Sequence, residues 1–156
     1  MSHDHHYAAR LTWSGAAQGP TVNYAAYSRE VLAEVPGKPT LRGSADTAFR
    51  GDAALHNPED LLLIALSACH LLSYLAECAR AGVRVVSYED RAEGTMALRD
   101  GRVRFTGVVL RPRVAIAPES DPALALKLHG RAHADCFIAN SVNFPVRHEP
   151  EIVVGE

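Results

Sequence analysis

One long apolar segment, residues 57–80, constrains the fold of this chain more than any other part of its sequence. Asn57 is a good helix N-cap, and Pro58 follows at the first helical position, where its missing N–H costs nothing. Two acidic residues come next and place negative charge in the first turn, and Gly82 supplies a C-terminal stop. These signals predict one helix over residues 57–80.

This helix is apolar almost all the way round along its body, LLLIALSACHLLSYLAECA. A helix that is apolar on every side is buried, and one face of a sheet cannot cover it alone. We therefore expect a second helix or a partner subunit to pack on it. Its longest apolar stretch, residues 61–76, is interrupted by Ser67, His70 and Ser73, so it falls short of a membrane span.

The composition is that of one globular domain. The chain has 156 residues, of which 47% are hydrophobic and 22% charged, with a formal net charge of −2. This length predicts a single domain over residues 1–156, and the mixed charge gives no electrostatic footprint for nucleic acid or membrane. The first six residues hold no apolar signal-peptide core, and three cysteines make no structural disulfide framework. We expect a cytoplasmic protein with reduced thiols.

Strand patterns surround the long helix. Before it, alternation and turn residues predict strands, and after it they predict a hairpin, a second helix and a final strand. The predicted ranges are 7–13, 22–31 and 40–50 for the first strands, 95–116 for the hairpin, 120–134 for the helix and 143–154 for the last strand. Because strands segregate from helices instead of alternating with them, the fold class is α+β.

The three cysteines have different surroundings. Cys69 and Cys78 lie nine residues apart on the long helix, which puts them on opposite faces, so they cannot pair within one chain. Cys78 is best explained as a small core residue. Cys136 precedes an apolar run, and a helical turn beginning there would present amides that stabilise its thiolate. Taken singly, neither Cys69 nor Cys136 shows whether it is a packed core residue or a reactive thiol.

Several motifs follow one another in a specific order. They are Asn57-Pro58-Glu59-Asp60-Leu61-Leu62, then Ala65-Leu66-Ser67-Ala68-Cys69, Gly82-Val83, Leu110-Arg111-Pro112-Arg113-Val114, and the segment 132–142 around Cys136. Each motif is weak alone. Together they resemble, over roughly the whole chain, the OsmC family of osmotically inducible and organic-hydroperoxide-resistance proteins.

This resemblance implies both a fold and a chemistry. The resemblance implies an intertwined homodimer, in which two long central helices pack between antiparallel sheets. Members of the family reduce organic hydroperoxides in oxidative-stress defence, without a bound cofactor, and an external dithiol of the lipoyl type restores them. Carried over residue by residue, Cys69 would be the peroxidatic cysteine and Cys136 the resolving one, and Glu59 matches the glutamate of the family motif.

Peroxide reduction places a physical demand on the surroundings of Cys69. The attacking group is a thiolate, which becomes a sulfenic acid that a second thiol then captures. Burial disfavours that thiolate, so a nearby cation is needed, and an arginine held by Glu59 would serve. Ten residues of helix rise about 15 Å, too far for Glu59 to support Cys69 of the same helix. We therefore expect the glutamate to come from the facing subunit.

Two arginines are candidates for that cation. In one branch of the family the arginine stands two residues before a motif like Phe49-Arg50-Gly51, where this chain has Ala48. Arg50 would share a face with Ala48 on an extended strand. In the other branch the arginine precedes the cysteine by about forty residues, which points to Arg29. Both arginines remain candidates.

Two alternatives stay open. One is a zinc site, because His129 and His133 lie four residues apart on the second predicted helix, with Cys136 following and Cys69 or His70 as a fourth ligand. His70 is otherwise expected to pack in the core, and the peroxidase reading needs no metal.

The other alternative is a non-catalytic protein of the same fold that binds a small apolar ligand. For either the ligand or the peroxide, the apolar neighbours Leu66, Leu72 and Phe137 are candidates for a pocket wall.

Overall fold

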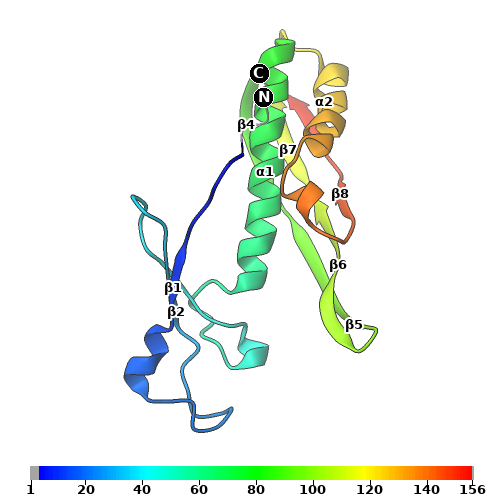
Figure 1. Ribbon diagram of the computed structural model, residues 1–156. Helices are drawn as coiled ribbons and strands as arrows, with labels where there is room; N and C mark the ends of the chain where they lie inside the picture. The colour runs from blue at the N-terminus through cyan, green and yellow to red at the C-terminus, as the bar shows by residue number, and fades with distance from the viewer. Residues whose placement is uncertain (1–3, 156) are drawn as a thin grey trace. The chain divides into compact units, whose positions relative to one another are not determined.

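The computed structural model describes residues 4–155, which form two compact units (Figure 1). The first unit ends at Leu61 and the second begins at Leu62. An antiparallel sheet in the order β1-β2-β3 organises the first unit. Its elements are β1 (Arg10–Thr12), the 3-10 turn η1 (Ser14–Gln18), β2 (Val31–Glu34), β3 (Leu41–Gly43) and the 3-10 turn η2 (Thr47–Phe49).

The strand predicted over residues 22–31 is wrong except at its last residue, where β2 begins. Side chains bind the backbone of this segment and hold it as an irregular loop. The indole N–H of Trp13 donates to the carbonyl oxygen of Ser28 at 2.8 Å, and the Asn23 side chain accepts from the N–H of Ala25 at 2.9 Å. Such local bonds compete with a strand ladder.

The strand predicted over residues 40–50 is also shorter than expected, because η2 follows β3. The Asp46 carboxylate caps this turn by accepting from the backbone N–H two residues on, at 2.7 Å. Arg50 ends it in the left-handed conformation, with φ of 66°. At Gly51 a Cβ would lie 1.6 Å from the carbonyl oxygen of Ala45, so only glycine fits the close return of the chain.

Helix α1 (Pro58–Ala81) matches its prediction within one residue at each end. The Asn57 side chain accepts from the N–H of Asp60 at 2.8 Å, which is the expected N-cap. Gly82 leaves the helix with φ of 76°, and the next N–H returns to the carbonyl of Cys78. By length and composition alone this helix could cross a membrane, contrary to the expectation that its interrupted apolar stretch falls short of a span, although the core helix of a soluble protein passes the same test.

The second unit holds two three-stranded sheets, with orders β4-β7-β9 and β5-β6-β8. A tight turn at Asp100 and Gly101, both left-handed, closes the predicted hairpin between β5 and β6. The C-terminal strands pair in parallel, β8 with β6 and β9 with β7, so each sheet is mixed. The bounds are β4 (Val85–Asp90), β5 (Glu93–Arg99), β6 (Arg102–Leu110), β7 (Pro112–Ile116), β8 (Val146–His148) and β9 (Glu151–Val154).

The last strand predicted, residues 143–154, is therefore two strands in different sheets. The peptide around Pro150 separates them, because proline has no N–H to give to a ladder. The α+β class itself is confirmed: two helices and segregated strands make up the chain.

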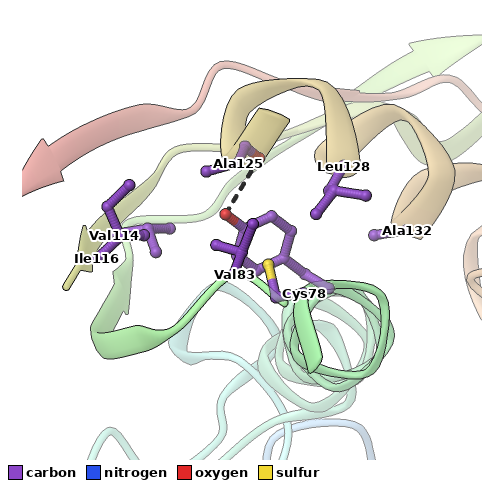
Figure 2. Packing of buried hydrophobic residues seen from close by; sticks show 8 residues of the cluster. Cys78, Val83, Val114, Ile116, Ala125, Leu128 and Ala132 are labelled. Atoms are coloured by element: carbon purple, nitrogen blue, oxygen red, sulfur yellow. Dashed lines mark hydrogen bonds between the residues drawn. The ribbon is translucent and has the colours of Figure 1, made fainter. Parts of the chain in front are cut away.

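Helix α2 (Pro122–Ala134) packs on α1, as the apolar body of the long helix predicted. Its N-cap is Asp121, which accepts from the N–H of Ala123 at 2.8 Å, whereas the Ser120 hydroxyl accepts from Arg84. Figure 2 shows the shared core, where the sulfur of Cys78 lies among side chains of α2 and β7. Cys78 is 1% exposed, which confirms its role as a small core residue.

A second buried cluster packs the other half of α1 against β6 and β8. Its buried members are Leu66, Val108, Leu110 and Val146. Between the two clusters, the buried side of α1 carries His70 and Tyr74, one helical turn apart. The Tyr74 hydroxyl donates to the carbonyl oxygen of Ala125 in α2 at 3.1 Å, the dashed bond in Figure 2.

Candidate functional site

Two of the cysteines meet in the second unit. Cys69 lies half-buried in the middle of α1, and Cys136 lies 1% exposed in the turn that follows α2. Their side chains are in hydrogen-bonding contact, and both carry free thiols. The turn is fixed by its own backbone, because the N–H of Asn140 donates to the carbonyl of Cys136 at 3.0 Å. The thiols are thus positioned by a buried helix on one side and a bonded turn on the other.

The environment of Cys136 keeps its thiol protonated. Burial raises its pKa to about 11, and the neighbouring Cys69 adds to the rise. The backbone N–H of Ala139 donates to Sγ at 3.5 Å and works in the opposite direction. The expected stabilisation by a turn amide is therefore present, but desolvation outweighs it.

The first unit contains an apolar pocket of about 660 Å³. Its wall is built by β1, β2, β3, the loop before β2 and the first turn of α1. The apolar side chains that line it include Leu11, Trp13, Tyr27, Val31, Leu41 and Phe49. Two predicted site residues, Arg29 and Glu59, line the same pocket.

The two charged residues do not pair with each other in this structure. The guanidinium of Arg29 donates to the carbonyl oxygens of Tyr24 and Tyr27 and lies over both rings, 4.9 and 3.8 Å from their centroids. On Glu59, Oε2 is buried and lacks a hydrogen-bond partner within residues 4–155. The carboxylate is therefore an open acceptor in the pocket wall.

Arg50, the other candidate cation, lies outside this pocket. Its side chain is exposed, and its guanidinium is 5.9 Å from the centroid of the Tyr24 ring. The expectation that it shares a strand face with Ala48 is wrong, because both residues belong to the η2 turn and its end. Of the two arginines, only Arg29 shares a pocket with Glu59.

The three apolar residues expected to form a pocket wall are not gathered. Leu66 is fully buried in the core beside β6, so it cannot face a ligand. Leu72 and Phe137 are 66% and 79% exposed. Periodicity along a helix does not show which of its apolar faces packs in the core. The residues that line the apolar pocket all belong to the first unit.

Four histidines form a second polar group in the second unit. His70 and His129 are fully buried, as expected for His70, and their Nε2 and Nδ1 atoms lie 3.0 Å apart. His133 and His148 are half-buried at the edge of the group. No local pattern pointed to His148, because the pairing of β8 with β6 brings it from a distant segment.

The zinc site expected from His129, His133 and Cys136 is not assembled in this structure. Cys136 contacts Cys69 and the amide of Ala139, while the histidines contact one another. Among the described residues, no three histidine, cysteine or carboxylate side chains are arranged to hold a metal ion as they stand.

Comparison with known proteins places this geometry in a family. The model of the OsmC-like protein family matches residues 51–151, which include α1, both thiols and all four histidines. The chain belongs to the OsmC-like family. A solved OsmC-like protein of unknown function from Vibrio cholerae is 32% identical, with a TM-score of 0.87 over 94% of this chain and 99% of that one.

More distant OsmC-like relatives share the fold. The uncharacterized protein YmaD of Bacillus subtilis is 24% identical over 97% of each chain. An organic hydroperoxide resistance protein from Elizabethkingia anophelis has a TM-score of 0.70 at 16% identity, over 99% of this chain and 100% of that one. The α+β fold of this chain is thus shared with proteins named for hydroperoxide resistance.

Proposed function

We propose that this OsmC-like protein is a thiol peroxidase that reduces organic hydroperoxides. The observation that carries the proposal is the contact between the thiols of Cys69 and Cys136. The Cys69 thiolate attacks the terminal peroxide oxygen, the O–O bond breaks, and the alkoxide leaves as an alcohol after taking a proton. The Cys69 sulfenic acid then condenses with the Cys136 thiol, which releases water and forms a disulfide.

The raised pKa of Cys136 supports its assignment as the resolving cysteine and that of Cys69 as the attacking one. With a pKa of about 11, Cys136 stays a neutral thiol at neutral pH and is a poor first nucleophile. Cys69 is the more accessible of the two, so the proposal assigns the attack on the peroxide to it. An external dithiol of the lipoyl type then reduces the disulfide by thiol–disulfide exchange, which suits a reducing, cytoplasmic compartment.

The pocket of the first unit supports an organic substrate. Its wall is apolar and aromatic, which favours a bulky alkyl or aryl hydroperoxide over hydrogen peroxide. Arg29 is the activating cation in this proposal, and Glu59 is the group that positions it. The open Oε2 of Glu59 can accept the guanidinium once Arg29 leaves the carbonyls of its loop.

The proposal also requires a homodimer, in which Arg29 and Glu59 of one copy act on Cys69 of the other. An apolar stripe on α1 supports it, opposite the buried side of the helix. Ile64, Leu72 and Leu75 are 50%, 66% and 38% exposed, and they repeat with the spacing of a helix–helix seam. A second α1 would cover this stripe.

The test is stopped-flow consumption of cumene hydroperoxide by the reduced protein, with dihydrolipoamide as the reductant. We expect multiple turnovers for the wild type, no consumption by Cys69→Ser, and a single turnover by Cys136→Ser. Arg29→Lys and Arg50→Lys form a matched pair, since only Arg29 lines the pocket. We expect Arg29→Lys to lose at least about tenfold in kcat/KM and Arg50→Lys to keep its rate.

A second candidate function, the binding of a small apolar ligand without turnover, is favoured by the pocket alone. It becomes the leading function if the reduced wild type consumes no hydroperoxide. Equal losses in the two arginine variants would instead remove Arg29 from the proposed mechanism.

A further inference from the structure

The four histidines of the second unit come from three different elements. His70 lies on α1, His129 and His133 lie on α2, and His148 ends β8. The centroid of the His148 ring lies 5.5 Å from that of His70 and 5.1 Å from that of His133. No peroxidase step uses this group, and imidazoles so close together in a protein core need a physical explanation.

The fully buried pair cannot satisfy its own hydrogen bonds. The centroids of His70 and His129 are 5.3 Å apart with a 3.0 Å bond between nitrogens, so the nearly coplanar rings meet edge to edge. A neutral ring that donates in this bond has a bare lone pair on its other nitrogen, and the ring that accepts has an N–H there. Whichever ring donates, one buried lone pair and one buried N–H are left over.

The structure shows that the nitrogens left over from this bond have no hydrogen-bond partner among the described residues. His70 Nδ1 and His129 Nε2 are buried and without a partner within residues 4–155, and so is His133 Nδ1. An unpaired polar atom in a core destabilises the folded state, because it has lost its hydrogen bonds to water. Two of these nitrogens, His70 Nδ1 and His133 Nδ1, can carry bare lone pairs at the same time, and a bound cation is a group that would take both.

We propose that His70, His133 and His148 bind one late first-row divalent cation, such as Zn²⁺ or Co²⁺, with His129 as the hydrogen-bond partner that orients His70. The cation takes the lone pair of His70 Nδ1, so His70 Nε2 carries the proton and donates to His129 Nδ1. A metal-bound histidine normally donates its other N–H in this way, which fixes its tautomer. The lone pair of His133 Nδ1 is used as well.

Ring spacing and charge state agree with this assignment. Imidazoles bound tetrahedrally at about 2.05 Å have centroids about 5 Å apart, close to the spacings of His148 from His70 and His133. The rings do not converge on one point as they stand, so His133 and His148 must turn about their side-chain bonds. Burial lowers the pKa of His70 to about 4, so its ring is neutral and can ligate at neutral pH.

The cation would be structural and independent of the peroxidase proposal. It would join α1, α2 and β8 beside the turn that holds Cys136, and three protein ligands leave one tetrahedral position for water. Imidazole-only ligation suits Zn²⁺, Co²⁺, Ni²⁺ or Cu²⁺, whereas Mg²⁺ and Ca²⁺ prefer oxygen ligands.

The experiment is a titration of the reduced, metal-free protein with Co²⁺ and Zn²⁺, followed by the visible cobalt spectrum and by calorimetry. The starting variant carries His3→Ala, His5→Ala and His6→Ala, because those N-terminal histidines can chelate metal themselves. We expect one ion per chain, a d–d spectrum of a four-coordinate site, and no thiolate-to-cobalt charge-transfer band. The melting temperature should rise with metal concentration.

Variants assign the ligands. His133→Gln and His148→Gln remove half-buried rings, and each should weaken Co²⁺ binding at least about tenfold while the far-UV circular dichroism stays unchanged. Cys69→Ser/Cys136→Ser is the matched control and should bind Co²⁺ like the starting variant. No ion bound by the starting variant would overturn the proposal. Binding that survives both histidine variants, or is lost in the cysteine control, would overturn it too.

Discussion

The thiol of Cys69 on α1 is in hydrogen-bonding contact with the thiol of Cys136, which directly follows α2. Both residues are held by packed elements, so a disulfide between them needs little movement of the backbone. Cys78, the third cysteine, faces the core on the other side of the helix and is 1% exposed.

Oxidation should therefore stabilise the second unit. A disulfide between Cys69 and Cys136 closes a long loop, and the chain-entropy estimate for such a loop is about 4 kcal/mol. Urea unfolding of the diamide-oxidised and reduced wild type measures the difference. Cys136→Ser should show none of it. A disulfide mapped to Cys78 by peptide mass spectrometry would contradict the pairing.

The reactivity of Cys136 should depend steeply on pH. Burial raises its pKa to about 11, and an acid with a raised pKa stays protonated until the pH approaches that value. Since the thiolate is the reacting form, alkylation of Cys136 by iodoacetamide in the reduced wild type, followed by peptide mass spectrometry, should rise about tenfold per pH unit from pH 7 to 10. In the urea-unfolded chain the rise should level off near an ordinary cysteine pKa. A plateau below pH 9 in the folded protein would disprove the raised pKa.

Tyr74→Phe tests the bond that joins the two helices. The Tyr74 hydroxyl donates to the carbonyl of Ala125, and both residues are fully buried. Its removal leaves that carbonyl unpaired and should lower the free energy of unfolding by about 1–3 kcal/mol. Tyr7→Phe, at a residue 93% exposed, is the control and should change nothing measurable. Equal stabilities of the two variants would show that the buried bond contributes little.

Leu72→Glu tests the dimer that the peroxidase proposal requires. Leu72 is 66% exposed on α1, so a single chain can carry a charge there without loss of its core. In a dimer joined along α1, two buried carboxylates would oppose each other, and association should weaken by at least about 2 kcal/mol. Light scattering after size exclusion reports the mass. A wild type that is already monomeric would remove the shared-site proposal.

Local signals explain what could be predicted from the sequence. Helix α1 is capped at Asn57 and stopped at Gly82 by residues within or next to it, and the β5–β6 hairpin is set by its Asp100-Gly101 turn. Those features depend on residues that are close together in the sequence, so local patterns predict them.

The remaining features depend on distant partners or on side chains that bind the backbone. Residues 22–30 look like a strand by composition, yet Trp13 and Asn23 hold them as a loop. Arg50 looks extended, yet the close approach at Gly51 forces a turn. His148 joins the other histidines only because β8 pairs with β6, and no local sequence pattern predicts that pairing.

The two C-terminal strands have a consequence for synthesis of the protein. β8 joins the sheet of β6 and β9 joins the sheet of β7, so both sheets are finished by residues that are translated after Cys136. A nascent chain that has just exposed Cys136 still lacks both strands, and its thiols emerge before the sheets beside them are complete. During that interval the two cysteines depend on the reducing power of their surroundings, and a chain cut short after α2 would never leave that state.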